Sequence, residues 1–264
     1  MQISRTLRKR LFGLRWRWEG FKNKVYDWRH GTKTHQECFL NTQGVTDVQA
    51  LQGNNVYRPF WRKEFFDAIR ALDVDLTDYL FIDIGSGKGK LLLLASHFPF
   101  SGIVGIEYAP ALHATAVNNI KQFKYKAGRP GIMSVNANAM TWGLPTKPAV
   151  YFLHNPFDLK TTQAFFAKLD DHVARSGVPT FMIYGNLRGV AEREAAFASA
   201  RSLVLKKRAP RFLVHAAHQA RFCRSTPSPP PTSRGEDAQQ DSFCITASVE
   251  ASLMSAYPQK RTFA

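Results

Sequence analysis

Residues 81–90, FIDIGSGKGK, combine residue types whose spacing points to a particular chemistry. Asp83 lies near the end of an apolar run, and Gly85, Gly87 and Gly89 follow it on alternate positions. Glycine permits a sharp turn and lets a ligand approach the backbone, and a helix that begins here would offer free N–H groups. The pattern predicts a ligand-binding turn between a strand and a helix, with a carboxylate beside it.

Two common phosphate-binding motifs do not fit these glycines. A dinucleotide-binding turn, G-x-G-x-x-G counted from Gly85, needs glycine at the position of Lys90. A P-loop needs Ser or Thr after its lysine, and neither Lys88 nor Lys90 is followed by one. The carboxylate of Asp83 would also repel a phosphate, whereas it would attract a cationic amino group.

Glu107 supplies a second carboxylate at the end of the next apolar run, VGIE. A carboxylate at that place can accept hydrogen bonds from both hydroxyls of a ribose. A ligand with an ammonium group, a ribose and no phosphate is S-adenosylmethionine. The two carboxylates and the glycine turn therefore predict this cofactor, and no metal ion is expected.

Asn155, Pro156 and Phe157 follow the apolar run in YFLHNPFD, at the end of a predicted strand that would face the ligand crevice. The tripeptide resembles the [DN]-P-P-[YF] loop of methyltransferases that act on planar amino groups, with one proline missing. The resemblance implies that the Asn155 oxygen accepts from the target N–H, that the aromatic ring stacks on the acceptor, and that transfer is an in-line displacement.

The shortened loop leaves other interpretations open. Without the second proline, the acceptor could be a lysine or another flexible amine instead of a base or a glutamine amide. Asn155 and Pro156 could also simply end a strand. His154 should alternate to the opposite side of the strand from Asn155, which favours a supporting histidine over a base.

From residue 79 onward, short apolar runs alternate with helical patterns, as expected for a parallel sheet buried on both faces. The predicted strands cover 79–84, 101–107, 131–136, 149–155 and 178–185. The predicted helices cover 60–72, 89–98, 109–123, 159–174 and 191–200. Two further runs, SLVLKKR and RFLVHAA, predict a closing antiparallel hairpin.

These motifs closely resemble the class I S-adenosylmethionine-dependent methyltransferases, particularly a mostly uncharacterised bacterial group, over residues 56–215. The shared pattern is IDIGSGKGKLLLLA, then Phe-Pro-Phe, IVGIEYAPALHATAVNNI and Asn-Pro-Phe. The resemblance implies an α/β fold: a Rossmann-like seven-stranded mixed sheet of order 3-2-1-4-5-7-6, flanked by helices, with an antiparallel last strand.

The resemblance also implies roles for the cofactor-site residues. Asp83 and the glycine turn would lie near the methionine moiety, and Glu107 would bind the ribose. Asn138 stands where the family usually has an aspartate that accepts from the adenine amino group, so a weaker hold is expected. Tyr57 would either close over the cofactor or serve as a packing aromatic.

Basic residues are concentrated near the N-terminus of a chain whose net charge is +16. The first 30 residues hold nine Lys or Arg and two acidic residues. This segment could form a basic amphipathic helix on a membrane or another anionic partner, although the spacing of Trp16, Trp18 and Phe21 is only partly helical. Alternatively, it is a loosely attached arm whose aromatics pack on the main domain.

Composition divides the chain into a basic N-terminal arm over 1–44, a methyltransferase domain over 45–222, and a Pro- and Ser-rich tail over 223–264 that is expected to be disordered. Residues 31–59 read as irregular. Three widely spaced cysteines, no signal peptide and no apolar run long enough to span a bilayer predict a cytoplasmic protein.

The predicted function is N-methylation of a protein side chain or another amine, with the methyl acceptor unidentified. The alternatives are a small-molecule or O-methyltransferase on the same fold, and a non-catalytic protein that keeps the cofactor fold. The last would bind nucleic acid or a membrane through its basic surface.

Overall fold

The structure is a computed structural model, and it describes residues 5–39, 56–57, 60–124, 130–185, 197, 200–209 and 212–217. The chain divides into two compact units, Met1–Cys223 and Arg224–Ala264, and all described residues belong to the first. The predicted tail, the domain boundary at residue 45 and nearly all of the helix predicted at 191–200 lie outside the described residues.

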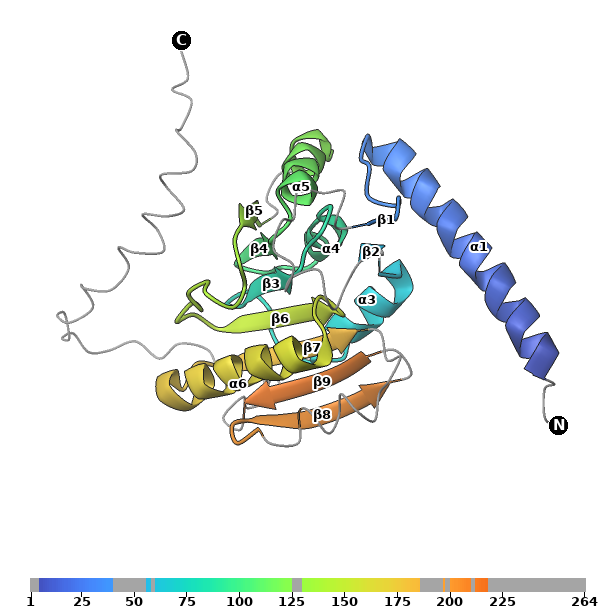
Figure 1. The fold of residues 1–264 in the computed structure, drawn as a ribbon. Helices are drawn as coiled ribbons and strands as arrows, with labels where there is room; N and C mark the ends of the chain where they lie inside the picture. The colour runs from blue at the N-terminus through green and yellow to red at the C-terminus, as the bar shows by residue number, and fades with distance from the viewer. Residues whose placement is uncertain are drawn as a thin grey trace, which may run out of the picture. The chain divides into compact units, whose positions relative to one another are not determined.

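A seven-stranded sheet forms the centre of the first unit (Figure 1). Its strands are β3 (Leu80–Ile84), β4 (Gly102–Glu107), β5 (Ile132–Asn136), β6 (Ala149–His154), β7 (Thr180–Gly185), β8 (Leu203–Ala209) and β9 (Phe212–Ala217). Their order is β5-β4-β3-β6-β7-β9-β8, and β9 alone runs antiparallel to both of its neighbours. This confirms the predicted order 3-2-1-4-5-7-6 and the closing hairpin.

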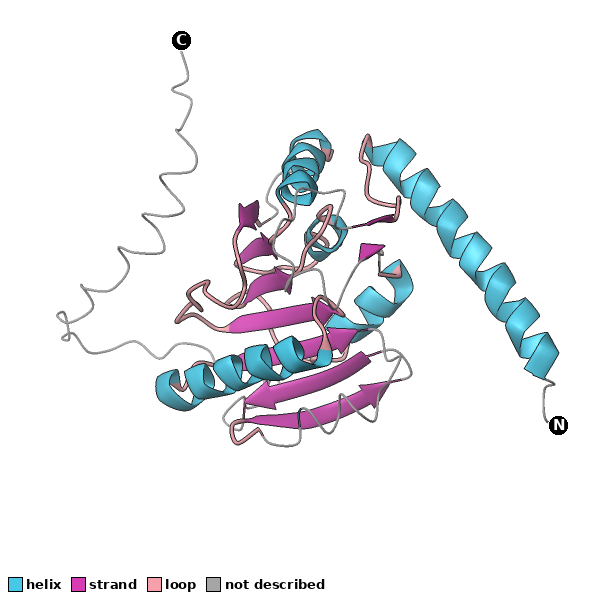
Figure 2. Cartoon of the chain, viewed as in Figure 1, coloured by secondary structure: helices cyan, strands magenta, loops and turns pink. Residues whose placement is uncertain are grey.

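Helices cover both faces of this sheet (Figure 2). They are α3 (Arg62–Arg70), α4 (Lys90–Ala95), α5 (Pro110–Gln122) and α6 (Leu159–Ser176). Alternate strand residues explain the two faces: Phe81 and Phe152 pack with α3 and α4, whereas Ile82 and Tyr151 pack with α6. The strands therefore read as continuous apolar runs because both of their faces are buried.

The N-terminal segment forms a long helix, α1 (Arg5–His30), followed by a small antiparallel sheet of β1 (Cys38–Phe39) and β2 (Val56–Tyr57). The prediction that 31–59 is irregular was therefore wrong for these two short strands. The prediction that the arm's aromatics pack on the main domain holds for Tyr26, which is buried in the core, but not for Trp18, Phe21 and Trp28, which are exposed. Among the described residues, no helix is long and apolar enough to cross a membrane.

Candidate functional site

The glycine turn joins β3 to α4, as its sequence predicts. Gly85, Gly87 and Gly89 have φ angles of +73°, +54° and +78°, in the left-handed region that side chains with a Cβ rarely adopt. The backbone N–H groups of Gly85 and Ser86 both donate to the Ile106 carbonyl, at 2.9 and 3.1 Å. These bonds tie the turn to the end of the neighbouring strand β4.

Gly85 also has a steric reason to lack a side chain. A Cβ placed on it would lie 2.6 Å from the Cβ of Pro156, far inside van der Waals contact. The loop after β6 therefore packs directly on the glycine turn. Two motifs that are 71 positions apart in the sequence are in contact because β3 and β6 are neighbours in the sheet.

The carboxylates of Asp83 and Glu107 stand at the ends of the adjacent strands β3 and β4, and both are buried. Burial, together with the nearby charge of Glu107, raises the pKa of Asp83 well above its ordinary value. Burial also raises the pKa of Glu107, although backbone N–H donors partly offset this. An acidic pair in such surroundings is stabilised in its charged form by a cation.

Glu107 holds the glycine turn in place. Its two carboxylate oxygens accept hydrogen bonds from the backbone N–H groups of Gly87 and Ala109, each at 2.7 Å. The backbone N–H of Tyr108 also donates to this carboxylate. A carboxylate offers about four acceptor positions, so about one remains for a ligand hydroxyl. The pair thus fits a cationic, phosphate-free nucleoside such as S-adenosylmethionine, and does not fit a pyrophosphate.

Asn155 is one of only two non-glycine residues of the described structure with positive φ, at +51°. The phenol of Tyr184, on the neighbouring strand β7, donates to the Asn155 amide oxygen at 3.2 Å. Asn adopts the left-handed region more readily than most residues, and the bond from the buried Tyr184 fixes the direction of its side chain. Sequence reasoning missed Tyr184, because only the strand register places it beside Asn155.

The neighbours of Asn155 lie in different surroundings. The His154 ring packs on Phe60 with centroids 4.8 Å apart, on the α3 face of the sheet, as its predicted alternation requires. Phe157 is partly buried against the α6 cluster, and its ring lies 5.9 Å from that of Phe165. In this arrangement Phe157 packs on the protein, and its predicted stacking on an acceptor stays a prediction.

Asn138 and Tyr57 are the two remaining predicted site residues. Asn138 is exposed after β5, and its amide oxygen accepts from the Met140 N–H at 2.9 Å, which leaves that oxygen one further acceptor position. Tyr57 pairs with Cys38 across the small sheet, and its side chain lies outside the described structure. Cys38 lies within electrostatic reach of Glu107, so this sheet is near the acidic pair.

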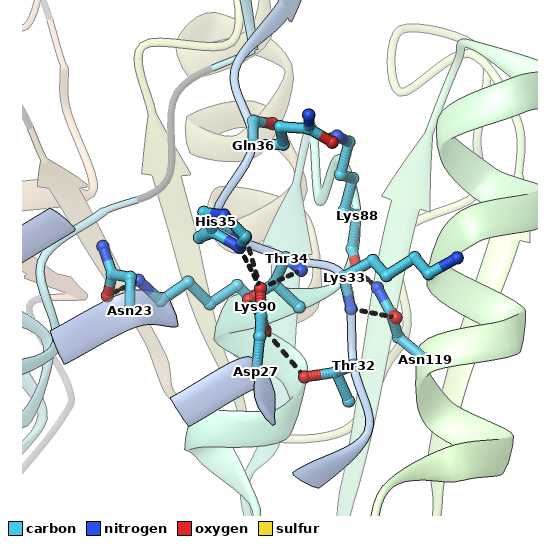
Figure 3. A network of polar contacts seen from close by, with 10 residues as sticks. All are labelled: Asn23, Asp27, Thr32, Lys33, Thr34, His35, Gln36, Lys88, Lys90 and Asn119. Carbon is cyan, nitrogen blue, oxygen red and sulfur yellow. Dashed lines mark hydrogen bonds and ion pairs between the residues drawn. The ribbon is translucent and has the colours of Figure 1, made fainter. Parts of the chain in front are cut away.

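The two lysines of the glycine motif contact the N-terminal segment instead of the ligand turn (Figure 3). The Lys88 ammonium donates to the Gln36 carbonyl at 2.9 Å, and the Lys90 ammonium donates to the Asn23 side chain at 2.5 Å. Burial lowers the pKa of Lys90 to about 8. These contacts give the lysines a structural role, which agrees with the failure of both phosphate-binding motifs.

Asp27 is the centre of the same network (Figure 3). Its carboxylate accepts from the hydroxyls of Thr32 and Thr34, from the backbone N–H groups of Thr34 and His35, and contacts the His35 ring at 2.6 Å. Burial alone would raise the pKa of Asp27, but these hydrogen bonds outweigh it and the pKa is lowered. Asn119 of α5 completes the attachment, because its side chain accepts from the Lys33 N–H and donates to the Lys88 carbonyl.

No family model matches the chain, and no curated protein matches it in sequence. Solved structures that match include magnesium protoporphyrin IX methyltransferase from Synechocystis PCC 6803 with bound S-adenosylmethionine, at 12% identity over 59% of this chain and 79% of that one, TM-score 0.42. An RNA methyltransferase from Salinibacter ruber in complex with S-adenosylhomocysteine matches at 17% identity over 60% of this chain and 92% of that one, TM-score 0.41.

A ribosomal protein L11 methylase from Lactobacillus delbrueckii subsp. bulgaricus matches at 15% identity, over 60% of this chain and 79% of that one, with a TM-score of 0.43. Because the identities are below 25% and the TM-scores below 0.5, these similarities assign no activity or substrate to this chain.

Proposed function

We propose that the protein is an S-adenosylmethionine-dependent methyltransferase that transfers the methyl group to a nitrogen of a protein side chain or another amine. The observation that carries this proposal is the buried acidic pair, Asp83 and Glu107, beside three left-handed glycines and against the Asn155 loop. In this proposal, the acidic pair and the bare backbone form one side of the site, and the Asn155 amide supplies an acceptor on the other.

When bound, S-adenosylmethionine would supply a methyl group to an acceptor nitrogen that attacks in line: the methyl–sulfur bond would break with its electron pair staying on sulfur, and the methylated nitrogen would release a proton to water. Asp83 stabilises the ligand's ammonium group, and the remaining acceptor position of Glu107 binds a ribose hydroxyl. Asn155, oriented by Tyr184, accepts a hydrogen bond from the acceptor N–H and so directs the nitrogen lone pair. The contribution of the chain is alignment and charge, so no residue needs to form a covalent bond.

Calorimetry with the folded chain tests the cofactor. S-adenosylmethionine and S-adenosylhomocysteine should both bind, and NAD, which carries a pyrophosphate, should not. Asp83→Asn should weaken binding of both nucleosides, because both carry the ammonium group. Binding of NAD in place of the two nucleosides would refute the assignment of the site.

Radiolabel from S-adenosylmethionine tests the reaction. In a lysate of the source cell, label should enter protein or another amine, and Asn155→Ala should abolish this transfer while calorimetric cofactor binding persists. Label found only as a methyl ester, which alkali releases as methanol, or as a methyl ether, which chromatography of the hydrolysate separates from N-methyl groups, would instead assign O-methylation.

A further inference from the structure

Helix α1 exposes five of the six large apolar side chains that the structure describes on it and buries its two acidic ones, the reverse of an ordinary surface helix. The described residues include seven large hydrophobic side chains that are exposed, and five of them lie on α1. They are Leu14 (64% exposed), Trp18 (59%), Phe21 (56%), Val25 (42%) and Trp28 (85%). We call these five residues the α1 stripe.

The spacing of the α1 stripe is regular. Its members follow one another at alternating intervals of four and three positions, which places them in one row along a helix. The same spacing continues in the sequence to Leu11 and Leu7. The interpretation based on Trp16, Trp18 and Phe21 missed this row because Trp16 does not belong to it.

Basic residues flank the α1 stripe on both sides. The positions beside the row are Arg8, Arg10, Arg15, Arg17, Lys22, Lys24 and Arg29, and all seven are basic. The only acidic residues of α1, Glu19 and Asp27, are both buried, at 6% and 4% exposure. The outward face of the helix therefore combines an apolar row with positive charge.

The opposite face of α1 attaches it to the rest of the unit. The Asn23 side chain accepts a hydrogen bond from the buried Lys90, and the Tyr26 and Phe123 rings stack with centroids 6.4 Å apart. Asp27 accepts from the Thr34 N–H, and the preceding Lys33 N–H donates to Asn119 of α5. Because these contacts use the face away from the stripe, the stripe does not serve to hold α1 on its own domain.

We propose that the α1 stripe is a docking surface for an anionic lipid membrane, in which α1 lies flat in the interface. Trp and Phe prefer the boundary between headgroups and acyl chains, and Lys and Arg stems reach from that depth to lipid phosphates. Cationic flanks attract the negative surface potential of the bilayer. This proposal is independent of the reaction that the acidic pair supports.

A second copy of the chain fits the same face less well. In a self-paired coiled coil, basic residues on both sides of the seam would face other basic residues, and the seam would contain Trp18 and Trp28 in place of branched aliphatic side chains. An acidic helix from another protein would satisfy the charges but would still have to enclose both tryptophans.

Vesicle flotation with the full chain tests the proposal. The chain should float with vesicles of phosphatidylcholine and phosphatidylglycerol, should not float with phosphatidylcholine alone, and should bind less as salt rises. Trp18→Ser/Phe21→Ser/Trp28→Ser keeps every charge and should weaken binding at least about 100-fold, from the lost apolar burial.

Charge-reversal variants measure the electrostatic contribution to vesicle binding separately from the apolar one. Arg17→Glu/Lys24→Glu should weaken binding about 30-fold or more, from the loss of two surface cations near an anionic bilayer. The matched control, Arg175→Glu/Lys147→Glu, changes the same residue types at exposed positions away from α1 and should bind as the parent does. Thermal midpoints within a few degrees of the parent show that each variant folds.

Three results overturn the proposal: no flotation of the parent chain with anionic vesicles, equal weakening by the two charge-reversal pairs, or unchanged flotation of the triple serine variant. Sedimentation velocity tests the two other candidate partners, a second copy of the chain and an acidic helix. Stripe-dependent self-association, or binding to an acidic helical peptide, without vesicle binding would assign the stripe to a protein partner instead.

Discussion

Replacing Gly85 by alanine should damage the protein through the contact between the glycine turn and the loop after β6. Gly85 has a φ of +73°, and the added Cβ would lie 2.6 Å from the Pro156 Cβ. The opposing atom belongs to a proline ring, which cannot rotate away. The loop must therefore give way by about 0.8 Å to reach ordinary contact at 3.4 Å.

Two costs add in this substitution. Left-handed backbone costs alanine about 1–2 kcal/mol, and overpacking costs about 1–3 kcal/mol, so the free energy of unfolding should fall by about 2–5 kcal/mol. Because a misplacement of about 1 Å can cost about 100-fold in rate, turnover should fall by more than cofactor affinity does.

Gly31 offers a matched control. Its φ is +68°, and nothing lies within 4 Å of a Cβ placed there, so Gly31→Ala has only the backbone cost. Urea unfolding of both variants should differ by about 1–3 kcal/mol. Equal destabilisation of the two variants would refute the contact between Gly85 and Pro156, and Gly85→Ala/Pro156→Gly should recover part of the loss.

Three further predictions follow from the buried polar groups. The raised pKa of Asp83 means that this carboxyl holds its proton more tightly in the ligand-free folded protein than in the unfolded chain. The protonated carboxyl therefore contributes stability that is fully present below pH 3.8, the ordinary pKa, and is lost as the pH rises toward the folded pKa. Without cofactor, the thermal midpoint of Asp83→Asn should therefore rise progressively above that of the parent as the pH increases from 3.8. The same variant should bind S-adenosylmethionine more weakly. A constant difference in thermal midpoint from pH 4 to 8 would contradict this prediction. Tyr184→Phe removes the donor to Asn155 and should lower kcat about 5-fold with little change in the calorimetric cofactor affinity, because one neutral hydrogen bond is worth about 1 kcal/mol. A change confined to affinity would count against a positioning role. Asp27→Ala leaves several buried donors unpaired, so it should lower the free energy of unfolding by about 3–5 kcal/mol and speed hydrogen exchange across α1. Equal protection of the α1 amides in the variant and the parent would show that the network does not hold the helix.

The sequence by itself predicted much of the fold. Continuous apolar runs, helical patterns between them and the closing hairpin indicated the strands and helices, because burial on both faces of a parallel sheet leaves a local signature. The glycine turn was also predicted from sequence, since positive φ and a following helix restrict the residue types that can occupy it. Asp83 and Glu107 could be paired because consecutive strands of a βα series end at one edge of the sheet.

Only the tertiary structure decided which distant residues meet. It brought Pro156 against Gly85 and the Tyr184 phenol to Asn155, and it turned Lys88 and Lys90 toward the N-terminal segment. It also decided which face of α1 is buried. A hydrophobic pattern predicts that the apolar side of a helix packs inward, but here buried hydrogen bonds of Asp27 and Lys90 attach the polar side instead. Such a choice depends on partners far along the chain, so no local periodicity could show it.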